Sequence, residues 1–152
     1  MCNCYICSTF GVANWQMDEL EQLYLVLKDQ SLSEEELQMR CVRYWREKFR
    51  SDSDAYYLLY KVHNEGKKTK RQAAKDKSLG IVSGAADVNV DIAKHGYHGL
   101  RIEFKTVFGK QSSNQKRFEQ ALIKNGYLYK VVRSLDEFKA LINWYLGDGE
   151  SY

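Results

Sequence analysis

Apolar residues recur at helical spacing in the first third of the chain. Three leucines that are three or four residues apart predict a short amphipathic helix over residues 17–29. These are Leu20, Leu23 and Leu27. A second helix is predicted from Ser33 to about Phe49, beginning with a capping box in which Ser33 and Glu36 satisfy each other's free backbone amides. Its inward-facing positions are Leu37, Cys41, Trp45 and Phe49.

The rest of the chain is predicted to alternate between strands and helices. Aromatic and aliphatic residues in AYYLLYKV predict a strand over residues 55–62, and period-two alternation predicts a hairpin over residues 86–106. Two helices are predicted to end at Gly80 and Gly126, where glycine suits a left-handed C-cap. The remaining elements are helices over residues 69–79 and 114–125, strands over 86–92, 100–106 and 127–132, and a last helix from a capping box at Ser134 and Glu137 to about residue 146.

This order of elements predicts an α/β domain. From residue 33 it reads α-β-α-β-β-α-β-α, and a hairpin followed by a strand–helix–strand crossover gives a mixed β-sheet flanked by helices. We expect an N-terminal segment over residues 1–32, one domain over residues 33–146 and a tail over residues 147–152.

The composition is that of an ordinary globular protein with the size of one domain. Hydrophobic residues make up 44% and charged residues 28% of the 152 residues. No stretch approaches the roughly 20 apolar residues that span a membrane, and the N-terminus lacks the residue order of a signal peptide. We therefore expect a cytoplasmic protein with no membrane partner.

Positive charge is concentrated in one short stretch, although the net charge is only +3. A basic cluster of this kind can contact phosphates and release counterions, which makes DNA a candidate partner. A solvated helix face gives the same pattern. The cationic residues are Lys67, Lys68, Lys70, Arg71, Lys75 and Lys77.

Three cysteines open the chain as Cys2, Cys4 and Cys7. Structural zinc usually takes four ligands in regularly spaced pairs, and no histidine lies close by to complete such a set. Free thiols in a reducing cytosol explain the same residues. The zinc signal is therefore weak.

Three charged residues interrupt the predicted hairpin, where strands usually favour apolar side chains. Glu103 and Lys105 project from the same face of one strand, and Asp87 on the other strand comes alongside them if the register permits. Two carboxylates brought together repel each other, and a hard divalent cation such as Mg²⁺ removes that cost. A lysine beside the metal can orient or deprotonate the attacking water. An exposed ion pair on an edge strand would produce the same E-x-K pattern.

The order of the sequence motifs resembles the virus-type replication-repair nuclease domain, VRR-NUC, of the PD-(D/E)xK nuclease superfamily. The motifs are GIVSGAADVNV, GYHGLRIEFKT, the glutamine-containing SSNQKRFEQALIKNGY, and VVRSLDEFKALI. The likeness covers residues 33–145 and is best to the small stand-alone versions of phages and bacteria. It implies a restriction-endonuclease-like fold and a metal-dependent DNA nuclease.

The resemblance also implies roles for individual residues. Asp87 and Glu103 match the family's metal-binding acids, and Lys105 matches its catalytic lysine. The peptide carbonyl of Phe104 would be a further metal ligand. Gln115 matches a glutamine that supports the catalytic site or the substrate. The implied cofactor is Mg²⁺, for which Mn²⁺ can substitute, with no small-molecule cofactor.

Two features of the sequence fit the family's motifs less clearly. The family's E-x-x-x-Q pattern selects Glu34, four residues before Gln38, as a further catalytic and metal-binding acid. Glu35 and Glu36 are close enough to compete with it, and all three acids also favour a helix N-terminus. The proline of the family's motif is Ala86 here; proline supplies no ligand, so its loss removes no chemistry.

Other positions are candidates for DNA contact. Ser83 and Gly84 resemble the family's glycine-rich approach to the aspartate, although a simple turn would also explain the glycine. Tyr97, His98 and Arg133 are weaker candidates. The expected function is a DNA endonuclease of repair, selective for Holliday junctions or other branched DNA and acting as a homodimer. The alternatives are a non-catalytic DNA-binding module with the nuclease fold and a zinc-organised interaction protein.

Overall fold

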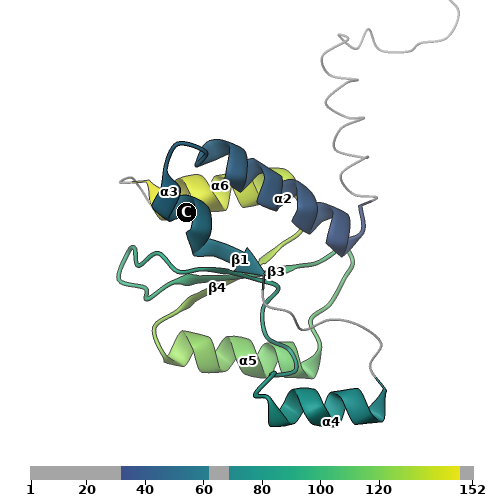
Figure 1. Ribbon diagram of the computed structural model, residues 1–152. Coiled ribbons are helices and arrows are strands. Elements are labelled where there is room, and N and C mark those ends of the chain that lie inside the picture. The colour runs from purple at the N-terminus through teal and green to yellow at the C-terminus, as the bar shows by residue number, and fades with distance from the viewer. Residues whose placement is uncertain (1–31, 62–68, 148–152) are drawn as a thin grey trace, which may run out of the picture.

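The computed structural model describes residues 32–61 and 69–147, which form a sheet with helices on both faces (Figure 1). The helices are α2 (Glu34–Lys48), α3 (Ser53–Leu58), α4 (Lys70–Ser78), α5 (Ser113–Lys124) and α6 (Leu135–Leu146). The strands are β1 (Leu59–Lys61), β2 (Val88–Val90), β3 (Leu100–Phe104) and β4 (Leu128–Val132). The helix predicted over residues 17–29 lies outside these ranges. Within them, no helix is long and apolar enough to cross a membrane.

The four strands form one mixed sheet in the order β1-β2-β3-β4. β2 pairs antiparallel with both β1 and β3, whereas β3 pairs parallel with β4. α5 makes the crossover between the two parallel strands, because a tight turn cannot join strands that run the same way. The predicted hairpin, crossover and mixed sheet are therefore confirmed.

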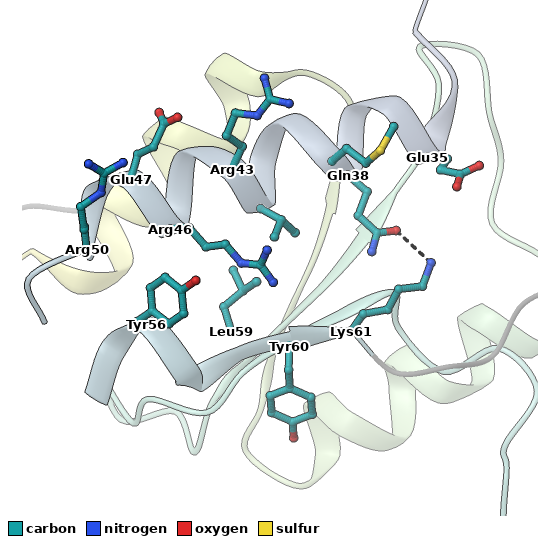
Figure 2. A pocket seen from close by; sticks show the side chains of 12 residues that line it. Glu35, Gln38, Arg43, Arg46, Glu47, Arg50, Tyr56, Leu59, Tyr60 and Lys61 are labelled. Carbon is teal, nitrogen blue, oxygen red and sulfur yellow. Dashed lines mark hydrogen bonds between the residues drawn. The ribbon is translucent and has the colours of Figure 1, made fainter. Parts of the chain in front are cut away.

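The strand predicted over residues 55–62 was wrong for most of its length. Its first half belongs to the short helix α3, where the Asp52 carboxylate accepts a hydrogen bond from the Ala55 amide at 3.1 Å. Of the predicted strand, only the part that forms β1 pairs with β2. β1 directly follows α3 and lies beside α2 (Figure 2). The aromatic residues suit a strand, but the preceding SDSD supplies a helix N-cap, which decides the local structure.

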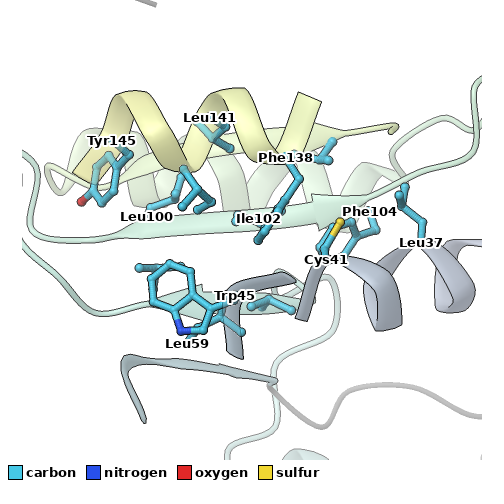
Figure 3. Packing of buried hydrophobic residues seen from close by; sticks show 14 of the residues in the cluster. Leu37, Cys41, Trp45, Leu59, Leu100, Ile102, Phe104, Phe138, Leu141 and Tyr145 are labelled. Atoms are coloured by element: carbon cyan, nitrogen blue, oxygen red, sulfur yellow. The ribbon is translucent and has the colours of Figure 1, made fainter. Parts of the chain in front are cut away.

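Helices α2 and α6 cover one face of the sheet, and α5 covers the other (Figure 1). Alternate residues of β3 point to the first face, so Leu100, Ile102 and Phe104 are buried in the core between the sheet and the two helices (Figure 3). The opposite face of β3 carries Arg101 and Glu103. The site described below lies on this second face.

α2 is positioned by its cap and by its buried stripe. Ser33 and Glu36 form the predicted capping box: the Glu36 amide donates to the Ser33 hydroxyl at 3.2 Å, and the Ser33 amide donates to the Glu36 carboxylate at 2.9 Å. Trp45 is fully buried and donates its indole N–H to the Ala55 carbonyl at 3.1 Å, which holds α3 against α2. The contact between Glu34 and Lys105 places the N-terminal end of α2 near the end of β3. The buried residues of α2 are Leu37, Gln38, Cys41 and Trp45.

α6 begins with half of the predicted capping box. The Ser134 hydroxyl accepts a hydrogen bond from the Glu137 amide at 3.1 Å. The Glu137 carboxylate accepts from the backbone amide of Arg133 at 2.6 Å. In a complete capping box Glu137 would accept from the amide of Ser134; here it accepts from the preceding residue, Arg133. The bond still satisfies a backbone amide next to the helix N-terminus.

Candidate active site

The two carboxylates predicted as metal ligands are neighbours across the β2–β3 hairpin. Val88 pairs with Ile102, and continuing this register by one residue places Asp87 opposite Glu103. The Phe104 amide donates a hydrogen bond to Oδ2 of Asp87 at 2.8 Å. Opposed residues on antiparallel strands have Cβ atoms about 5 Å apart, so their side chains share one site on the face that α5 covers.

Glu103 is fully buried, with 0% of its surface exposed. The side-chain amide of Gln115 on α5 donates to Oε1, and the hydroxyl of Tyr129 on β4 donates to Oε2 at 3.2 Å. Each bond offsets part of the cost of removing a carboxylate from water. Glu103 is therefore held from two sides by residues distant in sequence.

Lys105 directly follows β3 and links two carboxylates. Its Nζ lies 2.8 Å from Oε1 of Glu103 and 3.1 Å from Oε2 of Glu34. The Lys105 side chain is 8% exposed, whereas that of Glu34 is 44% exposed. The lysine therefore joins a buried acid to an acid that solvent and substrate can reach.

Burial and charge act in opposite directions on the pKa values of this cluster. Burial raises the pKa of Glu103, and hydrogen bonds from Lys105 and Tyr129 act against that rise. Burial lowers the pKa of Lys105, but the hydrogen bonds and negative charges of Glu103 and Glu34 more than offset it, so this pKa is raised. Burial also raises the pKa of Tyr129, which stays a hydrogen-bond donor. The lysine is thus kept as an ammonium ion among acids.

The three glutamates at the start of α2 have different surroundings. Glu34 reaches Lys105, Glu35 lines a groove beside α2, and Glu36 is engaged in the capping box with Ser33. Only the first of them therefore lies at the candidate site. The predicted role of Glu34 in metal binding stays a prediction, because the contact seen for its carboxylate is with Lys105.

Gln115 uses both ends of its side-chain amide. Its Oε1 accepts from the backbone amide of Ser112 at 2.7 Å, and the Ser112 hydroxyl accepts from the Gln115 amide, which together form a capping box at the start of α5. This leaves the NH₂ end of the side chain facing Glu103. Gln115 is therefore a positioning residue for the buried carboxylate.

The loop before Asp87 packs closely against the start of α5. Gly84 has a φ of +84°, and a Cβ atom there would lie 2.5 Å from the backbone of Asn114 and 2.6 Å from that of Gln115. Only glycine fits this position. The Asn114 side chain also donates to the Ser83 hydroxyl at 3.1 Å. These contacts explain both Ser83 and Gly84 structurally, and their contact with DNA stays a prediction.

The carboxylates do not form a ready-made metal cluster. Among the described residues, no group of three His, Cys, Asp or Glu side chains is placed to hold a metal ion, and Lys105 already binds both Glu103 and Glu34. Opposed carboxylates at Asp87 and Glu103, with the backbone of Phe104 in contact, still provide the hard oxygen donors that Mg²⁺ prefers. The chemistry of these donors therefore suits a divalent cation, and its binding stays a prediction.

The predicted DNA-contacting cations are only partly described. Lys70 and Arg71 lie at the start of α4 and are exposed. α4 stands apart from the sheet, on the side of α5 (Figure 1). Lys67 and Lys68 lie outside the described residues. The exposed start of α4 is compatible with phosphate contact and with a solvated helix face.

The predicted zinc ligands lie outside the described part of the chain. They are Cys2, Cys4 and Cys7. Cys41 is buried in the hydrophobic core and takes part in no disulfide within residues 32–61 and 69–147. Its burial explains its presence without any metal, since free cysteine packs as a small apolar residue.

The weaker candidates for DNA contact have structural partners or lie elsewhere. Arg133 donates from one guanidinium nitrogen to the carbonyl oxygens of Thr106 and Gly109, at 2.7 and 3.0 Å. It therefore fixes the loop that follows β3. Tyr97 and His98 lie in the connection between β2 and β3, at the opposite end of the hairpin from the carboxylates.

Tyr129 is the residue of this site that sequence reasoning missed. Tyr129 was given no role at the site from the sequence, and its hydroxyl donates a hydrogen bond to Glu103. The parallel register sets Tyr129 beside Arg101, two residues from Glu103 along β3. Parallel register depends on the crossover through α5 and leaves no local pattern in the sequence.

Comparison with known proteins found similarity to a solved structure. No protein-family model matches the chain, and no curated protein matches it. A solved structure described as a "VRR_NUC domain protein" is similar, with a TM-score of 0.67 and 27% sequence identity. The similarity covers 76% of this chain and 89% of that one. The mixed sheet and its flanking helices are thus a restriction-endonuclease-like fold, similar to that of a VRR_NUC domain protein.

Proposed function

We propose that this domain is a divalent-metal-dependent deoxyribonuclease that hydrolyses phosphodiester bonds. The observation that carries the proposal is the buried Glu103–Lys105 pair with Asp87 opposite and Glu34 on the lysine. Three carboxylates around one lysine are costly for folding, because buried acids need compensating positive charge. A site that takes up a metal cation and a phosphate has a use for that arrangement.

Asp87, Glu103 and the carbonyl of Phe104 would hold Mg²⁺, with Mn²⁺ able to take its place. When bound, such a metal polarises a phosphate and lowers the pKa of a coordinated water. Asp87 is already aligned by its hydrogen bond from the Phe104 amide. Asp87 and Glu103 lie opposite each other across the hairpin, which favours a shared cation.

Lys105 would position the attacking water and stabilise negative charge that develops on the phosphate. Glu34 holds the lysine from the exposed side, and Gln115 and Tyr129 hold Glu103 from the buried side. The residues that touch substrate or metal are thus separated from those that set their position.

For the substrate we propose branched DNA, with four-way junctions foremost, cut by a homodimer. A two-fold symmetric enzyme can make paired cuts in two strands of a symmetric substrate. The exposed cations Lys70 and Arg71 at the start of α4 supply phosphate contacts on the α5 side of the sheet. The domain would act on DNA repair or replication intermediates.

The test is cleavage of labelled four-way junction, flap, linear duplex and single-stranded DNA, with Mg²⁺, Mn²⁺ or EDTA, by the wild type and by Asp87→Ala. Symmetric junction cutting that is lost with EDTA and in the variant supports the whole proposal. Variant-sensitive cutting of other substrates alone keeps the nuclease and removes the junction specificity. Binding without cleavage of any substrate would replace the proposal with a non-catalytic DNA-binding module. Circular dichroism checks that the variant is folded.

A further inference from the structure

The exposed side of α2 forms one wall of a groove of about 690 Å³ (Figure 2). α3 and β1 form the other wall. The groove residues on α2 recur every three or four positions and so make a second stripe along the helix, next to the one buried in the core. They are Glu35, Gln38, Met39, Val42, Arg43, Arg46 and Glu47, and Arg50 lines the groove just after the helix ends.

This stripe is apolar along its middle and unevenly charged along its length. Met39 is 56% exposed and lies beside Val42, with Leu59 of β1 across the groove. An acid, Glu35, lies at the N-terminal end, and arginines gather in the C-terminal half. The arginines are Arg43, Arg46 and Arg50. Exposed apolar residues at helical spacing are typical of a surface that receives another amphipathic helix.

We propose that residues 17–29 of this chain dock in the groove as an amphipathic helix antiparallel to α2. Residues 30–33 would make the reversal, and helical hairpins are commonly joined by about 2–5 residues. A helix over residues 17–29 would be about 20 Å long, close to the length of about 22 Å for α2. The segment therefore has the length and the attachment point to cover the stripe.

The order of charges supports the antiparallel direction. The start of the segment is acidic, and in this arrangement it lies beside the arginines of α2. Lys28, near the end of the segment, comes beside Glu35. The parallel direction would place acids beside the acid and the lysine beside the arginines. Three of the four acidic residues of the segment, Asp18, Glu19 and Glu21, lie in its first half, and the fourth, Asp29, follows Lys28 at its end.

The apolar face of the segment fits the middle of the groove. Its three leucines at helical spacing would cover the exposed Met39 and the partly buried Val42, which removes apolar surface of the leucines and of α2 from water. Docking would also fix the chain just before Glu34, the exposed partner of Lys105. The inference concerns packing, and it stands whether or not the site cleaves DNA.

The experiment is hydrogen exchange, read by mass spectrometry, on the full chain at several concentrations. We expect amides of residues 20–29 to exchange more than about tenfold slower than in an unstructured chain, independently of concentration. Met39→Asp should remove that protection and leave the protection of β3 unchanged. Lys124→Glu, an exposed charge reversal on α5 across the sheet, is the control and should change nothing in the segment.

A charge swap identifies the occupant. Arg43→Glu with Arg46→Glu should weaken the protection of the segment, and adding Glu19→Lys with Glu21→Lys should restore it. Free exchange of residues 20–29 in the wild type would overturn the proposal. So would protection that grows with concentration alongside a dimer in sedimentation, since a second copy would then fill the groove, and so would protection of the groove by added duplex DNA alone.

Discussion

Two ion pairs along the same strand, β3, have the same length and different surroundings. Arg101 lies 2.8 Å from Asp91, and Lys105 lies 2.8 Å from Glu103. The Asp91 side chain is 38% exposed, whereas that of Glu103 is fully buried. The distance between the charges therefore does not distinguish the roles of the two pairs. The residues that surround each pair distinguish them.

The pair near the turn of the hairpin is completed by structural partners. The Arg101 guanidinium lies 4.6 Å from the centre of the Tyr127 ring. The Tyr60 hydroxyl donates to Asp91 at 2.6 Å, which links β1 to the end of β2. One cation pairs with one acid here, and the surrounding contacts hold neighbouring strands together.

The pair at the other end carries an excess of acid. Lys105 serves both Glu103 and Glu34, and Asp87 lies across from Glu103. Two neutral hydrogen-bond donors, Gln115 and Tyr129, orient the buried carboxylate of Glu103. The two ends of the hairpin therefore differ in the ratio of acids to cations and in the fixed orientation of Glu103. The following variants test whether this difference marks a reactive site.

The largest effect is expected from Lys105→Met. Cleavage should fall by about 10²–10⁴-fold, because the variant loses the group that positions water and stabilises charge. The fold should lose about 3–5 kcal/mol, because Glu103 remains buried without its cation. Rates of DNA cleavage and urea unfolding measure the two effects separately.

The double variant Glu103→Gln with Lys105→Met separates stability from catalysis. It removes both charges of the buried pair, so most of the lost stability should return while cleavage stays absent. Recovery of cleavage together with stability would mean that the pair is structural, like the pair at the turn.

A smaller effect is expected from Gln115→Glu. The new carboxylate would face Glu103 in the interior, and loss of such a positioning partner typically costs about 10–100-fold in activity. The matched control is Gln120→Glu, at an exposed position of the same helix, which should cleave at the wild-type rate. Equal losses in both variants would show that only the charge of α5 matters.

Tyr129→Phe should have a modest effect. It removes one hydrogen bond to Glu103 and keeps the aromatic ring, so we expect a loss of about 1 kcal/mol in the free energy of unfolding. Cleavage should fall by about tenfold or less, which corresponds to about the same free energy. A fall of activity without any loss of stability would instead assign the hydroxyl to the substrate.

Arg101→Ala should leave cleavage nearly unchanged. Loss of the partly exposed ion pair and of the ring contact with Tyr127 should lower stability by about 1–2 kcal/mol. Unfolding and cleavage measured on one preparation test this directly. A loss of activity as large as that of Lys105→Met would erase the distinction between the two ends.

Much of the fold could be predicted from local signals. The capping box at Ser33 and the apolar spacing after it predicted α2, and Gly126 marks the end of α5 with a φ of +77°. The strand predicted over residues 55–62 was the main error, because the N-cap at Asp52 starts a helix there despite the strand preference of the aromatic residues. Local caps and periodicities are physical causes that act within a few residues, so sequence reasoning can follow them.

The site could be predicted only in part. Asp87, Glu103 and Lys105 were visible as charges in a hairpin, since alternation along a strand is a local property. The choice of Glu34 among three neighbours depends on how α2 meets the end of β3. The contact from Tyr129 depends on the parallel register. Both are tertiary relations that no short pattern encodes.

The central claim is that the Asp87 end of the hairpin hydrolyses DNA and the Asp91 end only holds strands together. The most direct measurement compares Mg²⁺-dependent DNA cleavage by Asp87→Asn and Asp91→Asn, two isosteric changes at opposite ends of β2. Asp87→Asn should lose at least about 10³-fold, and Asp91→Asn should stay within about twofold of the wild type. Equal activity in the two variants, whether retained or lost, would contradict the account.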